Sequence, residues 1–462
     1  MPAPVVSITQ MREWEKAAWA SGQTEAEVIR LVGTRLAQEA LRMTSPGDAI
    51  LILAGRGNNG ADARAALPHL QQRTSHLLLI EDPAAQLAEL QQALATAPAL
   101  VVDGLFGIGL NRPLSPEWIQ VMTTINKAAC RVLAVDVPSG LNADSGNPEG
   151  AAVRASVTLT VGAPKTGLLA PAAASYVGRL VVADSVGLGT CSFQTDAAWT
   201  LPSDFRNFPP ERAANSHKGS YGHVAIFAGS TGYHGAATLC ARGAQRAQPG
   251  LVTLFTMSAV YPVAASQLQA VMVSPWHPDA HLKSAWSAIV IGPGLAGPDV
   301  PEEFRHMVHR LWRDSHVPVV VDASALDWLK SGPLSTSYMR VVTPHPGEAA
   351  RMLGITAELV QADRPKAVRD LSNRFGGAWV VLKGHQTLVG QDHGPILVNS
   401  SGNPHMAQGG SGDLLAGYIG GLLAQPALRA NPAQTIAHAV WQHGASADLL
   451  QQSGKNWIIE DL

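Results

Sequence analysis

One pattern occurs twice along the chain: a short strand that is apolar at every position, a glycine-rich loop, and then an amphipathic helix. Strands with continuous apolar runs are typical of parallel sheets buried on both faces, with the intervening helices as the cover. The 462 residues are enough for two domains of ordinary size. We therefore expect an α/β protein with two doubly wound domains, at residues 1–200 and 214–462.

The expected elements follow from the apolar runs and the amphipathic periods. In the first block, strands are expected at 49–54, 76–80, 99–102, 131–135, 157–161 and 180–182, with helices such as 61–72 and 83–94. In the second block, strands are expected at 223–227, 251–255, 288–291, 318–321, 340–342, 379–382 and 396–398, and helices at 236–247, 303–313, 347–353, 366–375, 413–423 and 432–450. Residues 188–218 lose this periodicity and contain several prolines, which predicts a connector between the domains.

Charge and cysteine content exclude several classes of protein. The net charge of −2 provides no basic footprint for nucleic acid. The amino terminus lacks the apolar core of a signal peptide, and no apolar run reaches the roughly 20 residues of a membrane helix. The three scattered cysteines have neither metal-ligand spacing nor the number for a disulfide framework. We therefore expect a cytoplasmic protein that binds neither nucleic acid nor membranes.

The richest segment of the second block is the glycine-rich loop that runs from Asn399 into a helix at Asp413. Gly409, Gly410 and Gly412 let the backbone approach a ligand, and the amides at a helix N-terminus attract anions. Asp413 at the helix start has two interpretations. It is either a cap that bonds backbone amides, or a base that takes a proton from a substrate hydroxyl while the amides hold a transferring phosphoryl group.

Three further loops follow strands of the same block, at the edge where open α/β sheets bind ligands. Residues 292–295 form a tight turn, residues 343–348 hold His345 between two prolines, and residues 383–387 lie between two strands. His345 is either a structural hydrogen-bonding residue or part of a ligand pocket. Lys383 is either a solvated turn residue or a partner of phosphate oxygens.

Together these segments resemble the ADP/ATP-dependent NAD(P)HX dehydratases of the ribokinase-like superfamily. The resemblance spans nearly all of residues 215–450, and the run GNPHMAQGGSGD is its most specific part. It implies that a nucleotide phosphorylates the C6 hydroxyl of a hydrated nicotinamide ring, after which phosphate leaves and NADH or NADPH is restored. Phosphate is a far better leaving group than hydroxide, which accounts for the use of ADP or ATP.

The resemblance also implies roles for individual residues. Asp413 would be the catalytic base, and Mg²⁺ would neutralise the nucleotide phosphates, although the sequence has no dedicated ligand cluster for it. The NADHX or NADPHX pocket would be lined by Ala236, Gly294, His345 and Asp413. The nucleotide would be bound by Lys383, Gly384, His385, Gln386, Thr387, Gly410, Ser411 and Gly412.

Polar residues follow three strands of the first block in a similar way. Residues 55–62 form a glycine-rich turn into a helix, which is the context of a phosphate-binding loop, although the acidic partner of a complete dinucleotide fingerprint is missing. Residues 103–113 and 136–144 follow later strands. Their acidic residues are either helix caps and turn formers or parts of one shared crevice.

These segments, continued by GAPKTG at 162–167, resemble the NAD(P)HX epimerase domain, which is often fused to the dehydratase in bacteria. The resemblance covers most of residues 8–188 and implies a Rossmann-like domain that interconverts the R and S hydrates and binds K⁺. Asp136 is the first candidate for acid–base work, with Asp62 second. The K⁺ ligands would be Asn59, Asp103 and Ser139, a set of hard oxygens. The substrate would contact Asn58, Asn59, Gly60, Ala61, Asp62, Gly107, Ile108, Gly109, Leu110, Asn111, Arg112, Pro113 and Asp136.

The first block departs from the epimerase pattern at four positions. Ala61 and Ala63 stand where the family has glycine, so a positive φ at either position would be strained by the added Cβ. Arg30 and Leu31 stand where the family has Glu and Asn, which would remove polar groups from a pocket wall. This domain is therefore either an epimerase, weakened or intact, or a non-catalytic module for nucleotide binding or assembly.

A further alternative is an ordinary small-molecule kinase on the ribokinase-like fold, which would phosphorylate a hydroxyl and release the product. The HPGE and GNPHMAQGGSGD runs favour the dehydratase. A homo-oligomer is expected by resemblance alone.

Overall fold

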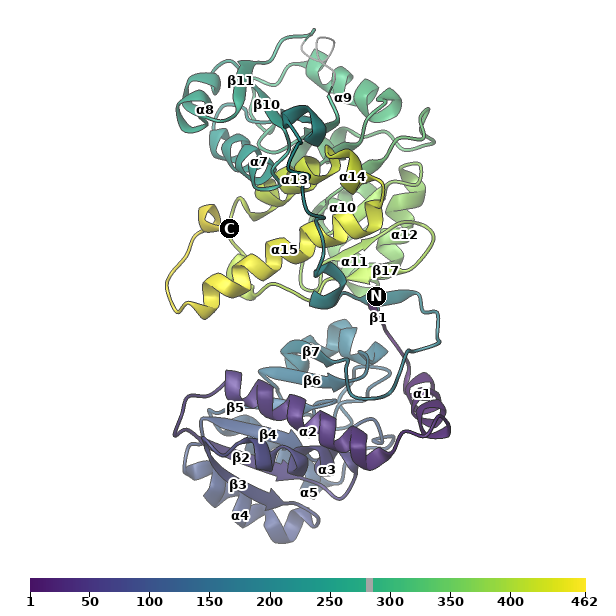
Figure 1. The fold of residues 1–462 in the computed structure, drawn as a ribbon, viewed down its shortest axis with the longest axis vertical. Helices are drawn as coiled ribbons and strands as arrows, with labels where there is room; N and C mark the ends of the chain where they lie inside the picture. The colour runs from purple at the N-terminus through teal and green to yellow at the C-terminus, as the bar shows by residue number, and fades with distance from the viewer. Residues whose placement is uncertain (280–285) are drawn as a thin grey trace. The chain divides into compact units, whose positions relative to one another are not determined.

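The computed structural model describes residues 1–279 and 286–462, and the chain divides into two compact units. One unit comprises Pro2–Trp199, and the other comprises Thr200–Leu462 together with Met1. In Figure 1 the first unit is coloured purple to blue and the second teal to yellow. None of the helices in the described ranges combines the length and the apolar character that crossing a membrane requires.

The N-terminal unit is built on a parallel sheet with the strand order β3-β2-β4-β5-β6-β7. The strands are β2 (Ala49–Ala54), β3 (Thr74–Leu79), β4 (Leu100–Gly104), β5 (Arg131–Val135), β6 (Val157–Val161) and β7 (Arg179–Ala183). A short antiparallel pair joins β1 (Ala3–Pro4) to β8 (Ala197–Trp199). Because β2, β4, β5 and β6 are neighbours and parallel, the loops that follow them emerge side by side.

Helices cover both faces of this sheet. They are α1 (Ile8–Ala20), α2 (Glu25–Arg42), α3 (Asn58–Ala65), α4 (Pro83–Ala95), α5 (Pro116–Lys127) and α6 (Ala174–Val177). Along β2, Ile50 and Ile52 join the core that α1, α2 and α3 complete, whereas Leu51 and Leu53 join the core under α4 and α5. Successive side chains of a strand face opposite sides of the sheet, so a strand that is apolar throughout is buried on both.

The C-terminal unit has a larger sheet, with the strand order β17-β16-β15-β14-β13-β12-β9-β10-β11. The strands from β15 to β11 in this order pair in parallel, whereas β16 pairs antiparallel with both β15 and β17. The strands are β9 (His223–Phe227), β10 (Leu251–Thr256), β11 (Met272–Pro275), β12 (Ala288–Ile291), β13 (Val319–Val321), β14 (Arg340–Val342), β15 (Trp379–Leu382), β16 (Leu388–Gly390) and β17 (Ile396–Val398). The loops after β12, β13, β14 and β15 therefore meet at one edge.

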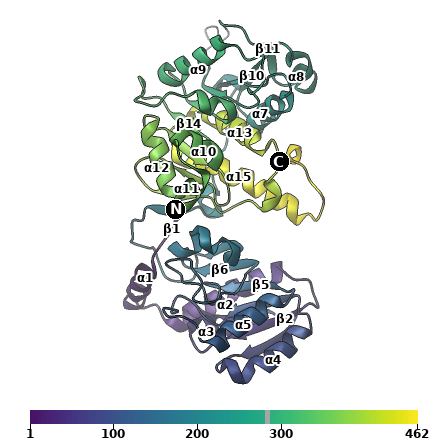
Figure 2. The ribbon, with the colours of Figure 1, turned by 180° about the vertical axis from the view of Figure 1, so that it is seen from behind.

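Helices also surround the second sheet, and Figure 2 shows them from behind. They are α7 (His234–Arg246), α8 (Tyr261–Gln267), α9 (Glu302–Asp314), α10 (Pro346–Leu353), α11 (Ala357–Ala362), α12 (Arg364–Arg374), α13 (Ser411–Leu423), α14 (Pro426–Arg429) and α15 (Pro432–Gln452). The backbones of α7 and α13 touch: a Cβ added at Gly417 would lie 1.9 Å from Cys240 O, and one at Gly243 would lie 2.0 Å from Leu414 O. Only glycine allows this approach, which sets the position of α13.

Most of the expected elements are present, with ends that differ by a few residues at most. The helix expected at 61–72 is wrong in its bounds. It begins at Asn58 and ends at Ala65, and Pro68 belongs to a separate 3-10 turn, because proline cannot continue an α-helix. The short strands β1, β8, β11 and β16 are absent from the expected set, and β8 lies within the expected connector.

Candidate active sites

Asp413 lies in the first turn of α13, behind a glycine in the left-handed conformation. The N-cap of α13 is Gly410, whose φ is 94°, and it makes no side-chain cap bond. Asp413 comes three residues later, so it is not the capping residue. Glycine is required by this backbone conformation, and a Cβ added at Gly410 would lie 2.4 Å from Leu239 Cδ1, so the leucine side chain would have to move. No side chain caps this helix start, so its amides can face an anion.

The Asp413 carboxyl is held near the midpoint of its titration at neutral pH. Burial raises its pKa to about 7, the Asp322 carboxylate and then Glu348 add to the rise, and the Lys383 ammonium opposes it. A carboxyl with such a pKa can take a proton from a hydroxyl and later return it, which is the property of a general base.

Lys383, which follows β15, is the centre of an ion-pair network. Its Nζ lies 2.6 Å from Asp322 Oδ1 and 3.9 Å from Glu348 Oε2. Burial lowers the pKa of Lys383, but the carboxylates of Asp322, Glu348 and Asp413 together outweigh burial and the net shift is upward. Lys383 is therefore positively charged. It also lies close to the start of α13, because a Cβ added at Gly412 would lie 3.2 Å from its Nζ.

Asp322, Thr343 and Glu348 belong to this site, although the sequence analysis did not select them. Asp322 follows β13 directly and is 1% exposed. Thr343 follows β14, and its Oγ1 donates a 2.7 Å hydrogen bond to Asp322 Oδ1. An aspartate immediately after an apolar strand, in the run VVVD, is the signal that could have identified Asp322. The same signal drew attention to Asp103 and Asp136 in the first block.

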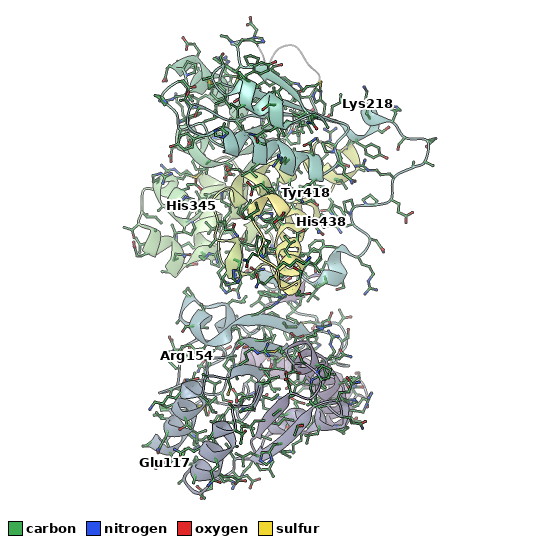
Figure 3. The ribbon with its side chains drawn as sticks, turned by 90° about the vertical axis from the view of Figure 1, so that its left-hand side faces the viewer. Glu117, Arg154, Lys218, His345, Tyr418 and His438 are labelled. Carbon is green, nitrogen blue, oxygen red and sulfur yellow. The ribbon has the colours of Figure 1, made fainter. Side chains whose placement is uncertain are left out.

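His345 is the N-cap of α10. Its Nδ1 accepts hydrogen bonds from Gly347 N at 3.0 Å and Glu348 N at 3.4 Å, and Glu348 Oε2 accepts from His345 N at 2.8 Å. This reciprocal capping box fixes the loop that follows β14. The imidazole itself stays exposed on that loop (Figure 3). His345 therefore has a structural role and still presents a ring edge to solvent.

The turn at 383–387, which was predicted to bind the nucleotide, is held by Arg364. This arginine donates hydrogen bonds to His385 O and, at 3.1 Å, to Leu382 O. Gln386 adopts a positive φ of 51°, which is a tight conformation for a residue with a side chain. Burial lowers the pKa of His385, and the charge of Arg364 lowers it further, so the imidazole is neutral at physiological pH.

Ala236 and Gly294, both predicted to line the dinucleotide pocket, are neighbours. A Cβ added at Gly294 would lie 2.8 Å from Ala236 Cβ and 2.7 Å from Tyr233 O. Buried Ser230 fastens the loop after β12, because its Oγ donates to Gly294 O at 2.6 Å and accepts from Gly297 N at 2.7 Å. The first turn of α7 and the loop after β12 therefore form one surface.

The N-terminal unit has a cavity of about 640 Å³ at the carboxyl ends of its central strands. Its wall includes these predicted substrate-contact residues: Asn58, Asn59, Asp62, Gly107, Ile108, Gly109, Leu110, Asn111, Arg112 and Asp136. Gly60, Ala61 and Pro113 are not part of the described wall. A Cβ at Gly60 would lie 2.0 Å from Gly55 O, so Gly60 packs inside the loop instead. Helices α1 and α2 supply the facing wall, which includes Glu15 and Glu25.

Asp136 is tied into a buried ion pair with Lys165, which was not selected from the sequence. Lys165 Nζ lies 2.5 Å from Asp136 Oδ1, and the Lys165 side chain is fully buried. The same oxygen accepts hydrogen bonds from Val161 N at 3.0 Å and Thr160 Oγ1 at 3.2 Å. Asp136 has a φ of 63°, so the backbone is held in a strained conformation to direct this carboxylate.

Asp62 faces a group of other carboxylates. Burial raises its pKa to about 8, the charges of Asp136, Glu15 and Glu25 raise it further, and Lys165 opposes the shift. Burial and Asp136 also raise the pKa of Glu15. Groups held in the protonated form among like charges are typical of acid–base sites.

The three predicted K⁺ ligands meet around the backbone of Phe106. Ser139 Oγ donates to Asp103 Oδ1 at 2.6 Å, and Phe106 N donates to Ser139 Oγ at 2.8 Å. Asn59 Nδ2 donates to Phe106 O at 2.8 Å. Burial raises the pKa of the fully buried Asp103 to about 6, although hydrogen bonds from Ser139 and Leu105 lower it in part.

The four departures from the epimerase pattern do not disturb the cavity. Ala61 and Ala63 lie inside α3 and are absent from the residues with positive φ, so the added Cβ atoms cause no backbone strain. Arg30 is exposed and pairs with Glu27 on its own helix. Leu31 packs against the core instead of the cavity. The expected loss of polar groups from the pocket wall is therefore wrong for these two positions.

Two doubly wound α/β units, each with buried carboxylates where its parallel strands end, define a bifunctional α/β enzyme. Residues 224–459 match the family model of NAD(P)H-hydrate dehydratase, and residues 78–167 match that of the YjeF-related protein N-terminus. The bifunctional NAD(P)H-hydrate repair enzyme Nnr of Coxiella burnetii is 36% identical over 471 residues, which cover 96% of this chain and 94% of the relative. The enzyme of the same name from Gloeobacter violaceus is 33% identical, with 96% and 93% covered.

Among solved structures, the ADP/ATP-dependent NAD(P)H-hydrate dehydratase from Bacillus subtilis, co-crystallised with ATP and Mg²⁺, is 32% identical. The match covers 55% of this chain and 90% of that one, with a TM-score of 0.49. The chain belongs to the family of bifunctional NAD(P)H-hydrate repair enzymes. It has a dehydratase domain and an epimerase domain, and membership of the family favours these activities over the small-molecule kinase and the non-catalytic N-terminal module.

Proposed function

We propose that the C-terminal unit restores hydrated NAD(P)H by transferring a phosphoryl group from ADP or ATP to the C6 hydroxyl, with Asp413 as the base. The observation that carries this proposal is the start of α13. There a carboxyl with a pKa of about 7 shares one turn with the amides of a helix N-terminus that no side chain caps. Phosphoryl transfer needs both a proton acceptor for the attacking hydroxyl and donors for the phosphoryl oxygens.

In the proposed reaction, Asp413 accepts the proton of the C6 hydroxyl as its oxygen bonds to the terminal phosphorus. The bond from that phosphorus to the nucleotide breaks, and the nucleotide leaves one phosphate shorter. The amides of Gly410, Ser411 and Gly412 hold the phosphoryl oxygens throughout. The C6–O bond then breaks, phosphate leaves with the electron pair, and loss of a proton from C5 restores the reduced nicotinamide ring.

Lys383 and the turn at 383–387 would bind the nucleotide, since an ammonium and turn amides suit phosphate oxygens. Mg²⁺ would neutralise the phosphates of the nucleotide. In the parts of the chain that the structure describes, no group of three or more His, Cys, Asp or Glu side chains could hold a metal. We therefore expect Mg²⁺ to enter on the nucleotide, as is usual for an ion held mainly by phosphates and water.

The test is recovery of the near-ultraviolet absorbance of reduced nicotinamide. The full chain would be given mixed R- and S-NADHX with Mg²⁺, K⁺ and either ADP or ATP, beside an Asp413→Asn variant whose folding is checked by circular dichroism. Recovery that requires a nucleotide and is lost in the variant supports the proposal. Failure of the wild type with both nucleotides would overturn it.

We further propose that the N-terminal unit inverts C6 of NAD(P)HX in its 640 Å³ cavity. Asp136 and Asp62 remain the acid–base candidates. The contacts support Asp62 as the proton carrier, because Asp136 is already bonded to Lys165 and Val161 N whereas Asp62 has a pKa of about 8. The Asp136–Lys165 pair would then orient the substrate.

Potassium is proposed to bind where Asn59, Asp103 and Ser139 meet the Phe106 carbonyl. These groups fit a monovalent cation, because they offer hard oxygens with a single formal charge between them. The bound ion would supply the countercharge for the buried Asp103 carboxylate. A homo-oligomer also remains a proposal, to be checked by light scattering on the purified chain.

A further inference from the structure

The glycine-rich loop that leads into α13 is fastened at its carboxyl end by a residue of α15. Ser411 Oγ and His443 Nε2 are 3.1 Å apart, within hydrogen-bond distance. His443 is 7% exposed. Burial and the charge of Arg246 lower its pKa to about 4, so the imidazole is neutral at physiological pH. A neutral ring bonds the hydroxyl without adding a charge to the phosphate site.

The amino end of the same loop is fastened by the same helix. Asp448 Oδ2 accepts a hydrogen bond from Gly402 N at 3.0 Å, and Asp448 Oδ1 accepts from Asn403 Nδ2 at 3.1 Å. Ser401 Oγ donates to the backbone oxygen of Trp441 at 2.6 Å. The side chain of buried Asp448 thus holds two consecutive residues of the loop.

The glycine-rich loop is in direct contact with α15 at Gly444, so the loop cannot move closer to the helix. A Cβ added at Gly444 would lie 2.4 Å from Ser401 Oγ and 2.7 Å from Gly402 N. The loop therefore rests directly on the backbone of α15 between its two side-chain anchors. This arrangement resists displacement at both ends of residues 402–411.

We propose that α15 positions the phosphate-binding loop through His443 and Asp448, and that His443 acts by orienting the Ser411 hydroxyl. This inference rests on the proposed function of the loop in phosphoryl transfer. His443 and Asp448 are positioning residues, because their contacts are with the loop and not with the reacting atoms. The position of Ser411 matters most in the transition state, where the transferring phosphoryl group must be held in line with the attacking oxygen.

A matched control lies one and a half turns earlier on the same helix. His438 is 4% exposed, and burial lowers its pKa to about 4, as for His443. Its ring contacts those of Phe205 and Phe208. Among the described residues, His438 Nδ1 has no hydrogen-bond partner, and Figure 3 labels His438 on α15. Replacement of His438 therefore reports the cost of changing a buried histidine of α15 without touching the anchor.

The test is a double-mutant cycle between His443→Leu and Ser411→Ala in the full chain, with nucleotide-dependent recovery of NADH as the readout. Loss of one oriented hydrogen bond predicts that kcat/KM for the nucleotide falls about ten-fold in either single variant. The double variant should be no worse than Ser411→Ala, and His443→Gln, which keeps a hydrogen-bonding atom near the place of Nε2, should recover most of the activity. His438→Leu should leave kcat/KM unchanged.

Multiplicative losses in the double variant would overturn the orienting role of His443, and so would an equal loss in His438→Leu. Asp448→Asn keeps one oxygen acceptor and tests the other anchor if His443→Leu does not fold. It should raise KM for the nucleotide several-fold, and an unchanged KM would overturn the role of Asp448. The wild-type assay separates these outcomes from failure of the proposed function, since that failure would abolish nucleotide-dependent recovery in every sample, including the wild type.

Discussion

Lys383 Nζ lies 2.6 Å from Asp322 Oδ1, so the cation of the dehydratase site is paired before any nucleotide arrives. Both charges act on Asp413, in opposite directions: Asp322 raises its pKa and Lys383 lowers it. We predict that Asp322→Asn moves the acidic limb of the kcat–pH profile to lower pH and that Lys383→Met moves it higher, each by on the order of one unit. Shifts of the same sign in both variants would contradict the proposed electrostatic coupling.

The pH dependence of the wild-type dehydratase should report Asp413 directly. The base must be ionised to accept a proton, so kcat should rise with pH and level off above a pKa of about 7. Steady-state rates at saturating nucleotide provide the measurement, with spontaneous epimerisation subtracted. A limb near pH 4, the ordinary value of an aspartate, would show that another group limits the rate.

The stability of the fold should depend on the same carboxyl. Asp413 has a higher pKa in the folded than in the unfolded chain, so its stabilising contribution is full below about pH 4 and is lost as pH rises through about 7. Asp413→Asn removes this loss. We predict that the variant is more stable than the wild type at pH 8 by on the order of 4 kcal/mol, and similar to it at pH 4. Urea unfolding of both chains at the two pH values is the measurement.

For the epimerase, Asp62→Asn is predicted to abolish interconversion of the R and S hydrates. Asp136→Asn should weaken substrate binding as well, because it leaves buried Lys165 without its carboxylate partner. Chromatographic separation of the two epimers over time measures the rate. Glu117→Gln, an exposed substitution on α5, is the control (Figure 3). An Asp62→Asn variant with wild-type rates would return Asp136 to the role of proton carrier.

A comparison of alanine substitutions at Gly410 and Gly394 separates the cost of backbone strain from the cost of side-chain overlap. Gly410→Ala adds a Cβ at a φ of 94° and only 2.4 Å from Leu239 Cδ1. Gly394 has a φ of 67° with nothing within 4 Å of the added Cβ. We predict that Gly394→Ala costs about 1 kcal/mol of stability and leaves activity intact, whereas Gly410→Ala costs about 2 kcal/mol and loses nucleotide binding. Thermal unfolding measures the stability of each variant, and calorimetric titration with ADP measures its nucleotide binding.

The effect of K⁺ on the epimerase should require the Asp103 carboxylate. Asp103→Asn keeps the shape of the side chain but removes the charge that a cation would neutralise. We therefore expect K⁺ to stimulate epimerisation, or to raise the melting temperature, in the wild type and not in the variant. Replacement of K⁺ by Na⁺ at constant ionic strength is the control. A wild type indifferent to K⁺ in both measurements would contradict the site.

The strand positions could be predicted from the sequence because buried parallel strands are apolar throughout. Strands β2, β5 and β9 are found where the apolar runs placed them. The short strands β11 and β16 could not be predicted in this way: β11 reads Met-Val-Ser-Pro and lies partly exposed at the edge of the sheet, and β16 is a three-residue run that ends in Gly390. Helix α3 was misjudged at its end because Pro68 outweighed the amphipathic pattern.

The position of Asp413 in the first turn of a helix could be predicted, because a glycine-rich motif precedes it. The ion pairs that form through tertiary contacts could not. Lys165 and Asp322 are distant in sequence from their partners Asp136 and Lys383, so pairing depends on which strands become neighbours. A charged residue directly after a buried strand, such as Asp322 after β13, is the sequence signal of such a pair.

The backbones of α7 and α13 are in direct contact, which fixes the spacing between the two helices. One carries Ala236 and the other carries Asp413, so this contact sets the distance between the wall proposed to hold the hydrated nicotinamide and the proposed base. Because the wall and the base are already aligned before the ligand binds, less of the binding free energy is needed to arrange the site. The alanine- and glycine-rich faces of α7 and α13 thus affect the rate of the proposed reaction: the small side chains keep the substrate wall and the base at a fixed separation.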